Sequence, residues 1–502
     1  MKMQSLGGGT GTIATATRAA MFAATLAATF AAALSTTSLL VAQTPAKRPL
    51  RTDDLFRLRT ISDPQRSPDG TWIAYTVSRA DTAKDRRDSD IWMTRWDGSA
   101  TARLTFSDEA ETSPRWSPDG KQLSFISSRQ GARGGQVWLL NIANGGEAEK
   151  ITSLPGGINS VEWSPDGRRL AMIVNDSEPS ADSANARPKP IVVNKYAYKE
   201  DGRGFIGDLH SRLWVFDLAT RTATQITAGD ADDGEPAWSP DGSRIAFVSM
   251  REPDADRYFN GDVYVVAATA GAVPRRMTTF HGSDGGPLSW STDGSQVAYR
   301  QGQEPKDFGY DGGFGVVALA PAAGGEPRLL TAKYDRAIFG ARWSMDGRYI
   351  FGTVSDDMHE YLVRVTPTNG AVERFAIPGL TPSEFSAGKD GEFAIVATSP
   401  AKPGELYAFN GSAARQLTHM NAWIDEIALS TTEAVTSRSD DGTEVHGVLR
   451  KPAGATSGAR LPLVVRIHGG PAAQSAFEFD FERELITAQG YAVLAPNYRG
   501  SS

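Results

Sequence analysis

A four-residue turn sequence recurs along the middle of this 502-residue chain and restricts the possible folds more than any other feature. Ser-Pro-Asp-Gly occupies residues 67–70, 117–120, 164–167 and 239–242, and related turns follow at 291–294, 344–347 and 389–391. A tryptophan stands directly before five of these seven turns. Successive turn glycines are 44 to 53 residues apart, except for one interval of 75. A repeat of this length indicates a propeller or another repeat architecture.

Each repeat has the composition of four short antiparallel strands. Asp and Gly tolerate the positive φ of a tight hairpin turn, and alternating stretches such as residues 122–127 (QLSFIS) follow the turns. A strand with an aromatic or aliphatic centre comes next, and most repeats end in Leu, Ile or Met followed by Thr. Four strands per repeat are typical of a propeller blade. The pattern predicts an all-β seven-bladed propeller over residues 50–430, with the tryptophans in the blade cores.

The long interval between two of the turns contains an insertion at about residues 176–210. Its first part is polar, and its second part predicts an extra hairpin that turns at Glu200 and Asp201. Insertions into repeats form loops, often on a binding face. Glu200, Asp201 and Asp208 are therefore candidate anchors for the terminal ammonium group of a substrate, and a solvated charged hairpin is the alternative.

The N-terminus has the pattern of a secretory signal peptide. Lys2 and Arg18 precede an uncharged apolar run over residues 19–42, and Lys47 and Arg48 follow it. We expect a signal peptide at residues 1–45, export to the periplasm or the medium, and no stable membrane association once the signal is removed. An uncleaved membrane anchor is the alternative, because the apolar run is long for a signal.

Composition excludes several classes of function. The chain has no cysteine, which rules out disulfides, thiolate catalysis and a lipid-modified N-terminus. A formal charge of −7 without a basic stripe argues against a nucleic-acid partner. The sequence contains no metal-ligand cluster and no nucleotide-binding loop in the required strand–helix context. We therefore expect no metal and no cofactor.

The last seventy residues have a different pattern. A hairpin with an Asp-Gly turn and a Pro/Gly/Ala-rich linker lead to an apolar strand at residues 463–467, predicted to be buried. The Gly-rich loop His468, Gly469, Gly470 and Pro471 follows, then a helix ending near Gly490 and a second apolar strand. This order predicts the start of a parallel α/β sheet. Glycines in such a loop allow backbone N–H groups to approach an oxyanion during acyl transfer.

The ordered combination resembles the prolyl oligopeptidase family of serine peptidases, and most of all its acylaminoacyl-peptidase and dipeptidyl-peptidase branch. The segments that carry the resemblance are DLFRLRTISDPQRSPDG, the Trp-led turns, KYAYKEDGRGFIGD, SDDGTEVHGVLRKP, HGGPAAQ and NYRGSS. The resemblance implies a propeller that covers an α/β-hydrolase domain and admits peptide substrates. It also implies that residues 431–502 begin the hydrolase domain and that Gly469 and Gly470 belong to the oxyanion loop.

The catalytic serine of such an enzyme is missing from the sequence. Hydrolases of this fold carry it in a Gly-x-Ser-x-Gly turn after the next strand, and these 502 residues contain no such pentad. We therefore expect the Ser-Asp-His triad beyond Ser502, a full-length exported serine peptidase, and no activity in the 502-residue chain itself. The alternatives are a non-catalytic propeller that binds partners in the cell envelope, and an esterase.

Overall fold

The computed structural model describes residues 46–129, 131, 134–177, 190–193, 195–201, 204–207, 209–253, 255–303, 315–470 and 472–502. The predicted signal peptide at residues 1–45 and most of the polar part of the insertion lie outside the described residues. Residues 49–502 form one compact unit. Seven four-stranded antiparallel sheets fill most of this unit, and we number them 1 to 7 in chain order.

The first four sheets have the following strands. Sheet 1 contains β1 (Thr60–Arg66), β2 (Trp72–Asp81), β3 (Arg86–Arg95) and β4 (Thr101–Arg103). Sheet 2 contains β5 (Glu111–Trp116), β6 (Gln122–Ser127), β7 (Gln136–Asn141) and β8 (Glu149–Lys150). Sheet 3 contains β9 (Ile158–Trp163), β10 (Arg169–Asn175), β13 (Ser211–Asp217) and β14 (Thr222–Gln225). Sheet 4 contains β15 (Asp233–Trp238), β16 (Arg244–Ser249), β17 (Asp262–Ala267) and β18 (Arg275–Arg276), with helix α2 (Ala255–Tyr258) before β17.

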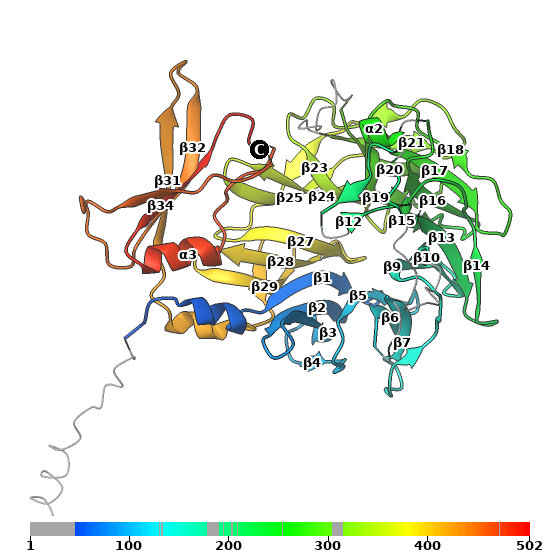
Figure 1. Ribbon diagram of the computed structural model, residues 1–502, viewed down its shortest axis with the longest axis horizontal. Helices are drawn as coiled ribbons and strands as arrows, with labels where there is room; N and C mark the ends of the chain where they lie inside the picture. The colour runs from blue at the N-terminus through cyan, green and yellow to red at the C-terminus, as the bar shows by residue number, and fades with distance from the viewer. Residues whose placement is uncertain are drawn as a thin grey trace, which may run out of the picture. The chain divides into compact units, whose positions relative to one another are not determined.

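The remaining three sheets follow the same order. Sheet 5 contains β19 (Asp284–Trp290), β20 (Gln296–Gln301), β21 (Val316–Pro321) and β22 (Arg328–Leu329). Sheet 6 contains β23 (Ile338–Trp343), β24 (Ile350–Asp356), β25 (His359–Val365) and β26 (Val372–Arg374). Sheet 7 contains β27 (Thr381–Ala387), β28 (Phe393–Ser399), β29 (Lys402–Phe409) and β30 (Ala414–Gln416). Each sheet contacts the next along the chain, and β27, β28 and β29 contact β1, so that the first and last sheets lie side by side (Figure 1).

The Ser-Pro-Asp-Gly turns join the first two strands of the sheets, and their geometry corrects one expectation. Gly70 has the predicted positive φ of 75°, but Asp69 is not in the left-handed region. The Asp69 carboxylate instead accepts hydrogen bonds from Ser67 Oγ (2.6 Å) and Thr71 N (3.0 Å). The glycine alone provides the positive φ of the turn. The aspartate side chain closes the turn as a hydrogen-bond acceptor.

The tryptophans before the turns connect neighbouring sheets. In four sheets the indole Nε1–H donates to a carbonyl oxygen in the first strand of the preceding sheet; these bonds run from Trp116 to Gln65 (2.9 Å), Trp163 to Arg115 (3.1 Å), Trp238 to Glu162 (3.1 Å) and Trp290 to Ala237 (3.0 Å). Three of the four side chains are buried, as predicted. The repeated tryptophan is thus a bond between sheets as well as a core residue.

The threonine at the end of most repeats has an equally regular role. In six sheets its hydroxyl accepts, at 2.9 Å, the N–H of a residue at or next to the third strand; these threonines are Thr105, Thr152, Thr227, Thr278, Thr331 and Thr418. All six threonines are buried. A buried hydroxyl that satisfies a backbone N–H fastens the fourth strand to the third strand.

The C-terminal segment forms a separate mixed sheet, drawn in orange and red in Figure 1. Its strands are β31 (Thr431–Arg438), β32 (Glu444–Lys451), β33 (Leu463–Val465) and β34 (Ala492–Asn497), in the order β31-β32-β34-β33. β33 and β34 are parallel, with helix α3 (Phe481–Ala488) between them in the chain, as the sequence predicts. Two short 3-10 helices, η1 (Thr52–Arg57) and η2 (Ala422–Glu426), stand before the first and after the last of the seven sheets in the chain.

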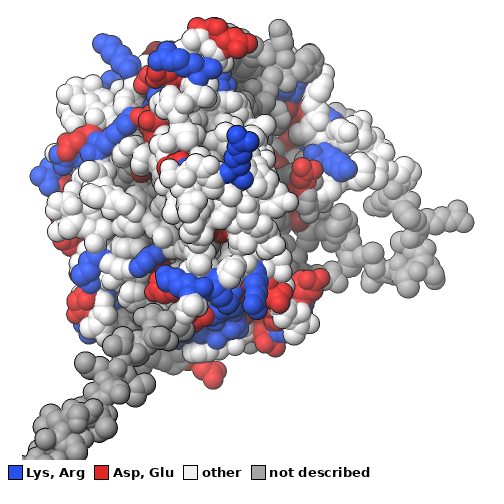
Figure 2. All heavy atoms as spheres, turned by 90° about the vertical axis from the view of Figure 1, so that its left-hand side faces the viewer, with Lys and Arg blue, Asp and Glu red and all other residues white. Residues whose placement is uncertain are grey.

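Strand β33 differs from its prediction. The apolar run was expected to be buried, but Leu463, Val465 and Ile467 are 54%, 53% and 59% exposed. β33 is the edge strand of the sheet, and only β34 pairs with it among the described residues. The face of the molecule that carries this sheet has a broad area without charged side chains (Figure 2). The apolar pattern correctly predicted a strand, but burial depends on what packs against the strand.

The C-terminal sheet is fastened to α3 and to the 3-10 helices. The Arg450 guanidinium in β32 and the Glu484 carboxylate in α3 form an ion pair, and both side chains are at most 1% exposed. Phe481 and Leu485 on the same helix pack against a cluster of Leu50, Ile424 and Ile427. The helix therefore covers one face of the sheet and joins it to the chain segments at the start and end of the seven sheets.

Candidate functional site

The Gly-rich loop lies at the carboxyl end of β33. Gly470 has φ +139°, and a Cβ added to it would lie 3.0 Å from Ala472 N. Gly469 has open space around the position of a Cβ. Among the described residues, no acceptor is hydrogen-bonded to the backbone N–H of Gly469 or Gly470. Two free donors at the end of a parallel strand can bind a carbonyl oxygen that gains negative charge.

His468 is held by three contacts. Its Nδ1 lies 2.8 Å from Gly469 O, its Nε2 lies 2.9 Å from Ser501 Oγ, and its ring stacks on Tyr498 with centroids 4.6 Å apart. A carbonyl oxygen only accepts hydrogen bonds, so Nδ1 donates to Gly469 O, and Nε2 lies at hydrogen-bond distance from the Ser501 hydroxyl. Both ring nitrogens therefore have partners, and His468 supports the loop.

The loop and the segment after it are attached to sheet 6. Gln474 Oε1 accepts from Met358 N (2.9 Å), and Gln474 Nε2 donates to His359 O (2.8 Å). The turn that provides these partners holds Asp357 and Met358 at φ +47° and +68°. Non-glycine residues are strained in this region, and such strain persists where the surroundings hold it in place. The position of the Gly-rich loop is thus coupled to one hairpin of sheet 6.

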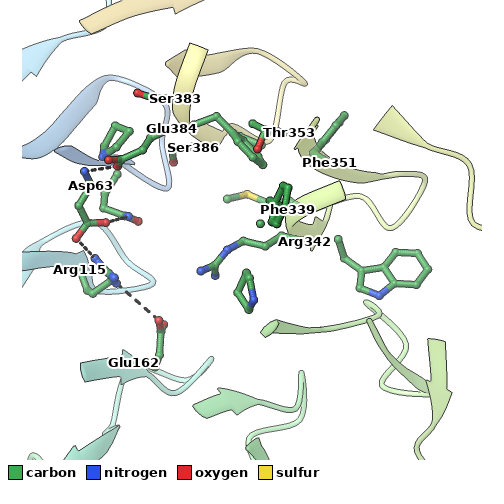
Figure 3. A pocket seen from close by; sticks show the side chains of 18 residues that line it. Asp63, Arg115, Glu162, Phe339, Arg342, Phe351, Thr353, Ser383, Glu384 and Ser386 are labelled. Carbon is green, nitrogen blue, oxygen red and sulfur yellow. Dashed lines mark hydrogen bonds and ion pairs between the residues drawn. The ribbon is translucent and has the colours of Figure 1, made fainter. Parts of the chain in front are cut away.

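A second feature is a cavity of about 470 Å³ where the first strands of six sheets meet. It is lined from the first strands β1, β5, β9, β19, β23 and β27 and from the second strand β24, and Figure 3 shows side chains pointing into it from several directions. We refer to it as the channel cavity. The register of β1, β5, β15, β19, β23 and β27 is interrupted by a bulge in each strand. Bulges of this kind redirect side chains and are common beside functional sites.

Residues with unusual backbone conformation sit at these bulges. Asp63, Ser113 and Glu235 have φ of +52°, +58° and +51°, and each is followed by proline. Gly340 occupies the same conformation in β23 with φ +63°. Because the same strained geometry recurs in several sheets, it is a property of the repeat that places side chains at the cavity.

A row of charged side chains crosses one wall of the channel cavity. Arg115 Nη1 lies 2.7 Å from Asp63 Oδ2, and Arg115 Nε lies 3.6 Å from Glu162 Oε1 (Figure 3). Glu384 Oε2 accepts from Asp63 N at 2.6 Å. These four residues come from β1, β5, β9 and β27, so the row joins four different sheets.

The pKa values of this row follow from burial and pairing. Burial lowers the pKa of the Arg115 guanidinium, but Asp63 and Glu162 outweigh burial and leave it above its ordinary value. Burial raises the pKa of Glu384, and the Asp63 N–H only partly offsets this effect. The wall therefore carries three carboxylates and one guanidinium, and Arg115 is shared by two of the carboxylates.

The residues proposed from sequence as a substrate anchor lie elsewhere. Asp208 is outside the described residues, and only the backbone of Glu200 is described, in the two-stranded ribbon β11 (Lys199–Glu200) and β12 (Gly204–Phe205). Asp201 is exposed at the turn of this ribbon and makes no hydrogen bond or ion pair to a described residue. Tyr196 N donates to Asp256 Oδ2 at 2.7 Å, which attaches the insertion to sheet 4.

The described part of the insertion is thus the predicted hairpin, but no hydrogen bond or ion pair between described residues connects it to the His468 loop. The anchor role remains a prediction. Pro471, the fourth residue of the predicted oxyanion loop, also lies outside the described residues.

The described residues contain no group of three or more His, Asp or Glu side chains that could hold a metal ion. Within the same residues, no helix has the length and apolar character needed to cross a membrane. The possible anchor at residues 19–42 lies outside this part of the chain.

Comparison with known proteins identifies the family. Residues 56–187 match the family described as the TolB beta propeller domain. Over 481 residues the chain is 31% identical to the uncharacterized peptidase YuxL of Bacillus subtilis (strain 168), an alignment covering 91% of this chain and 71% of the relative. The chain belongs to the prolyl oligopeptidase family.

The chain is also similar to a second relative in sequence and to a solved structure in fold. The chain is 25% identical over 486 residues to dipeptidyl-peptidase 5 of Porphyromonas gingivalis, covering 89% of this chain and 68% of that protein. The structure of Pyrococcus horikoshii acylaminoacyl peptidase has the same fold with a TM-score of 0.72 and 20% identity, over 89% of this chain and 66% of its own. The chain thus spans about two thirds of the length of these prolyl oligopeptidase family relatives.

Sequence reasoning found the His468 loop of this family member but missed the channel cavity. A signal for the cavity was present in the repeats. Asp63, Ser113 and Glu235 each precede a proline. Each also stands four residues before the serine that begins the Ser-Pro-Asp-Gly turn of its repeat. A polar residue before proline inside a predicted strand indicates a bulge. A bulge repeated in the first strand of successive sheets indicates that these strands direct side chains into a shared cavity.

Proposed function

We propose that this chain is the propeller and the first part of the catalytic domain of an exported serine peptidase, which hydrolyses peptides through an acyl-enzyme. The observation that carries the proposal is the pair of backbone N–H groups of Gly469 and Gly470, which bind no acceptor among the described residues and lie on a loop held by His468. In acyl transfer, attack on the scissile carbonyl moves charge onto its oxygen, and preorganised N–H donors stabilise this oxyanion.

We also propose the domain arrangement that such an enzyme requires. Sheets 1 to 7, over residues 50–430, are the seven blades of one ring; the contact between the first and last sheets supports this. The mixed sheet and α3, over residues 431–502, are the start of an α/β-hydrolase domain, and the parallel pair β33–β34 supports this.

The nucleophile and its partners belong to the part of the relatives that this chain does not match. We propose that the serine, aspartate and histidine lie in a segment after Ser502. The 71% coverage of the Bacillus subtilis relative and the absence of Gly-x-Ser-x-Gly from the 502 residues support this placement. The 502-residue chain is then inactive by itself, and no metal or cofactor takes part.

Peptides are the proposed substrates, and the periplasm or the medium is the proposed location. The names of the relatives, a dipeptidyl-peptidase and an acylaminoacyl peptidase, support the substrate class. The charged and apolar pattern of residues 1–45 supports export.

A pair of proteins tests the function. The 502-residue chain and a longer chain that continues through the coding sequence to its natural end are treated with a fluorophosphonate probe and with acylated and free peptides. We expect labelling and peptide hydrolysis only in the longer protein. Ester hydrolysis without peptide hydrolysis would favour an esterase, and the absence of any labelling would favour a non-catalytic binding protein.

A further inference from the structure

One guanidinium in the channel cavity is unpaired among the residues that the structure describes. Arg342 in β23 lines the cavity and points into it, and it forms no hydrogen bond or ion pair with any described residue (Figure 3). Arg115 on the opposite wall differs, because it is paired with both Asp63 and Glu162. The two arginines line the same cavity, but within the described part of the chain only Arg115 has partners for its hydrogen-bond donors.

The side chains around Arg342 form a mixed surface. Phe339 and Phe351 provide an apolar wall next to it, and Ser383, Ser386 and Thr353 contribute hydroxyl groups to the same cavity. Figure 3 shows Arg342 between the aromatic side and the charged row. A volume of about 470 Å³ lies within the range of small-molecule and short-peptide sites.

The carboxylates that line the cavity form no ion pair with Arg342 among the described residues. Asp63 and Glu162 share Arg115, and Glu384 accepts from the backbone of Asp63. Glu235 in β15 is close enough to be influenced by Arg342, but it forms no ion pair with it. A planar guanidinium with free donors selects carboxylates, because it can donate two parallel hydrogen bonds.

We propose that the channel cavity is a binding site for the C-terminal carboxylate of a peptide, with Arg342 as the group that recognises the carboxylate. The side chain of the last peptide residue packs against Phe339 and Phe351. The proposal deepens the proposed function, since it assigns the substrate class as peptides with a free C-terminus. It concerns residues that take no part in the oxyanion loop.

The test measures binding and does not require catalysis. The 502-residue protein is titrated calorimetrically with the peptide acetyl-Ala-Ala-Ala-Phe as the free acid and as the C-terminal amide. We expect the acid to bind about ten- to a hundredfold more tightly than the amide, because the charge-assisted hydrogen bonds are lost with the amide. Arg342→Gln should remove this preference, and Arg342→Lys should retain part of it.

Arg348→Gln is the matched control. It makes the same change of charge six residues later in the chain, where Arg348 is exposed and paired with Asp346 at 2.5 Å. This variant should keep the full preference for the acid. Thermal melting of each variant verifies that it is folded.

Three results would overturn the proposal: no binding of either peptide to the wild-type protein, equal binding of acid and amide, or an undiminished preference for the acid in Arg342→Gln. Failure here is distinct from failure of the proposed function, because serine labelling of the longer protein does not depend on Arg342. Conversely, the longer protein could bind the acid selectively and yet show no serine labelling. The site proposal would then stand, and the protein would be a peptide-binding protein.

Discussion

The guanidinium of Arg66 and the carboxylate of Asp390 form a two-pronged ion pair, with Nη1–Oδ1 and Nη2–Oδ2 distances of 2.5 Å and 2.7 Å. Arg66 ends the first strand of sheet 1, and Asp390 lies in the turn between the first two strands of sheet 7. The Arg66 side chain is 2% exposed and lies over the Trp96 ring. This pair therefore joins the two ends of the series of sheets.

Asp390→Asn should weaken this junction. It leaves the buried Arg66 guanidinium without its principal counter-charge, which costs about 2–4 kcal/mol of the free energy of unfolding. Denaturant unfolding monitored by tryptophan fluorescence measures the loss. Glu373→Gln, which removes a partly exposed pair with Arg364 inside sheet 6, should cost less than about 1 kcal/mol. Equal losses in the two variants would contradict a role in joining the sheets.

Two tryptophans at the same position of the repeat should respond differently to replacement by phenylalanine. Trp238 donates its indole N–H to Glu162 O, whereas the buried Trp343 Nε1 has no partner among the described residues. Trp238→Phe loses a bond between sheets, and Trp343→Phe removes an unsatisfied donor. We expect Trp238→Phe to lower the free energy of unfolding by about 1–2 kcal/mol more than Trp343→Phe does. A larger loss of unfolding free energy in Trp343→Phe than in Trp238→Phe would contradict the role of the hydrogen bond and would point to the lost ring volume as the cause.

The stability of the protein should fall as the pH rises from about 4 to 8. Burial raises the pKa of Asp284 to about 7 and that of Asp262 to about 6. A raised carboxyl pKa means that the folded state favours the protonated form, so its contribution is present below the unfolded pKa and is lost as the pH passes through the folded pKa.

Asp284→Asn therefore should stabilise the protein at pH 8, by roughly 2–4 kcal/mol, and should change little at pH 4. Thermal melting across this pH range measures the effect. Asp293→Asn is the control, because hydrogen bonds from Ser291 and Ser295 lower the pKa of Asp293 to about 2 and thus favour its charged form in the folded state. This variant should not gain stability at pH 8. An unchanged pH profile in Asp284→Asn would contradict the assignment.

Gly470→Ala should impair the proposed oxyanion loop, and the effect is measured in the longer protein proposed above. The added Cβ would meet Ala472 N at 3.0 Å, and the φ of +139° is unfavourable for alanine. We expect kcat/KM for peptides to fall about a hundredfold, because the loop donors are displaced. Gly458→Ala is the control: its φ of +80° imposes similar backbone strain in the linker, with open space around the Cβ. A similar loss of kcat/KM in both variants would point to general destabilisation.

The sequence predicted local structure correctly where residues close together in the chain determine it. The hairpin turns, helix α3 and the strand pairs of each repeat follow the sequence pattern, because turn glycines and alternating apolar residues act within a few positions. The expectation that Asp69 and its equivalents adopt positive φ was wrong, since one glycine suffices and the carboxylate is more useful as an acceptor. The burial of Leu463 was also mispredicted, because burial is a property of the neighbours.

The sequence by itself determined the repeat, the family and the position of the Gly-rich loop in the chain, since all three rest on residue types at short and regular spacing. The tertiary structure alone decided which side chains face the channel cavity, and that Arg115 has a partner among the described residues whereas Arg342 has none there. It also decided the junction of Arg66 with Asp390, which are 324 residues apart. These relationships depend on how whole sheets are placed around a common centre, and no local pattern records that placement because the partners come from different repeats.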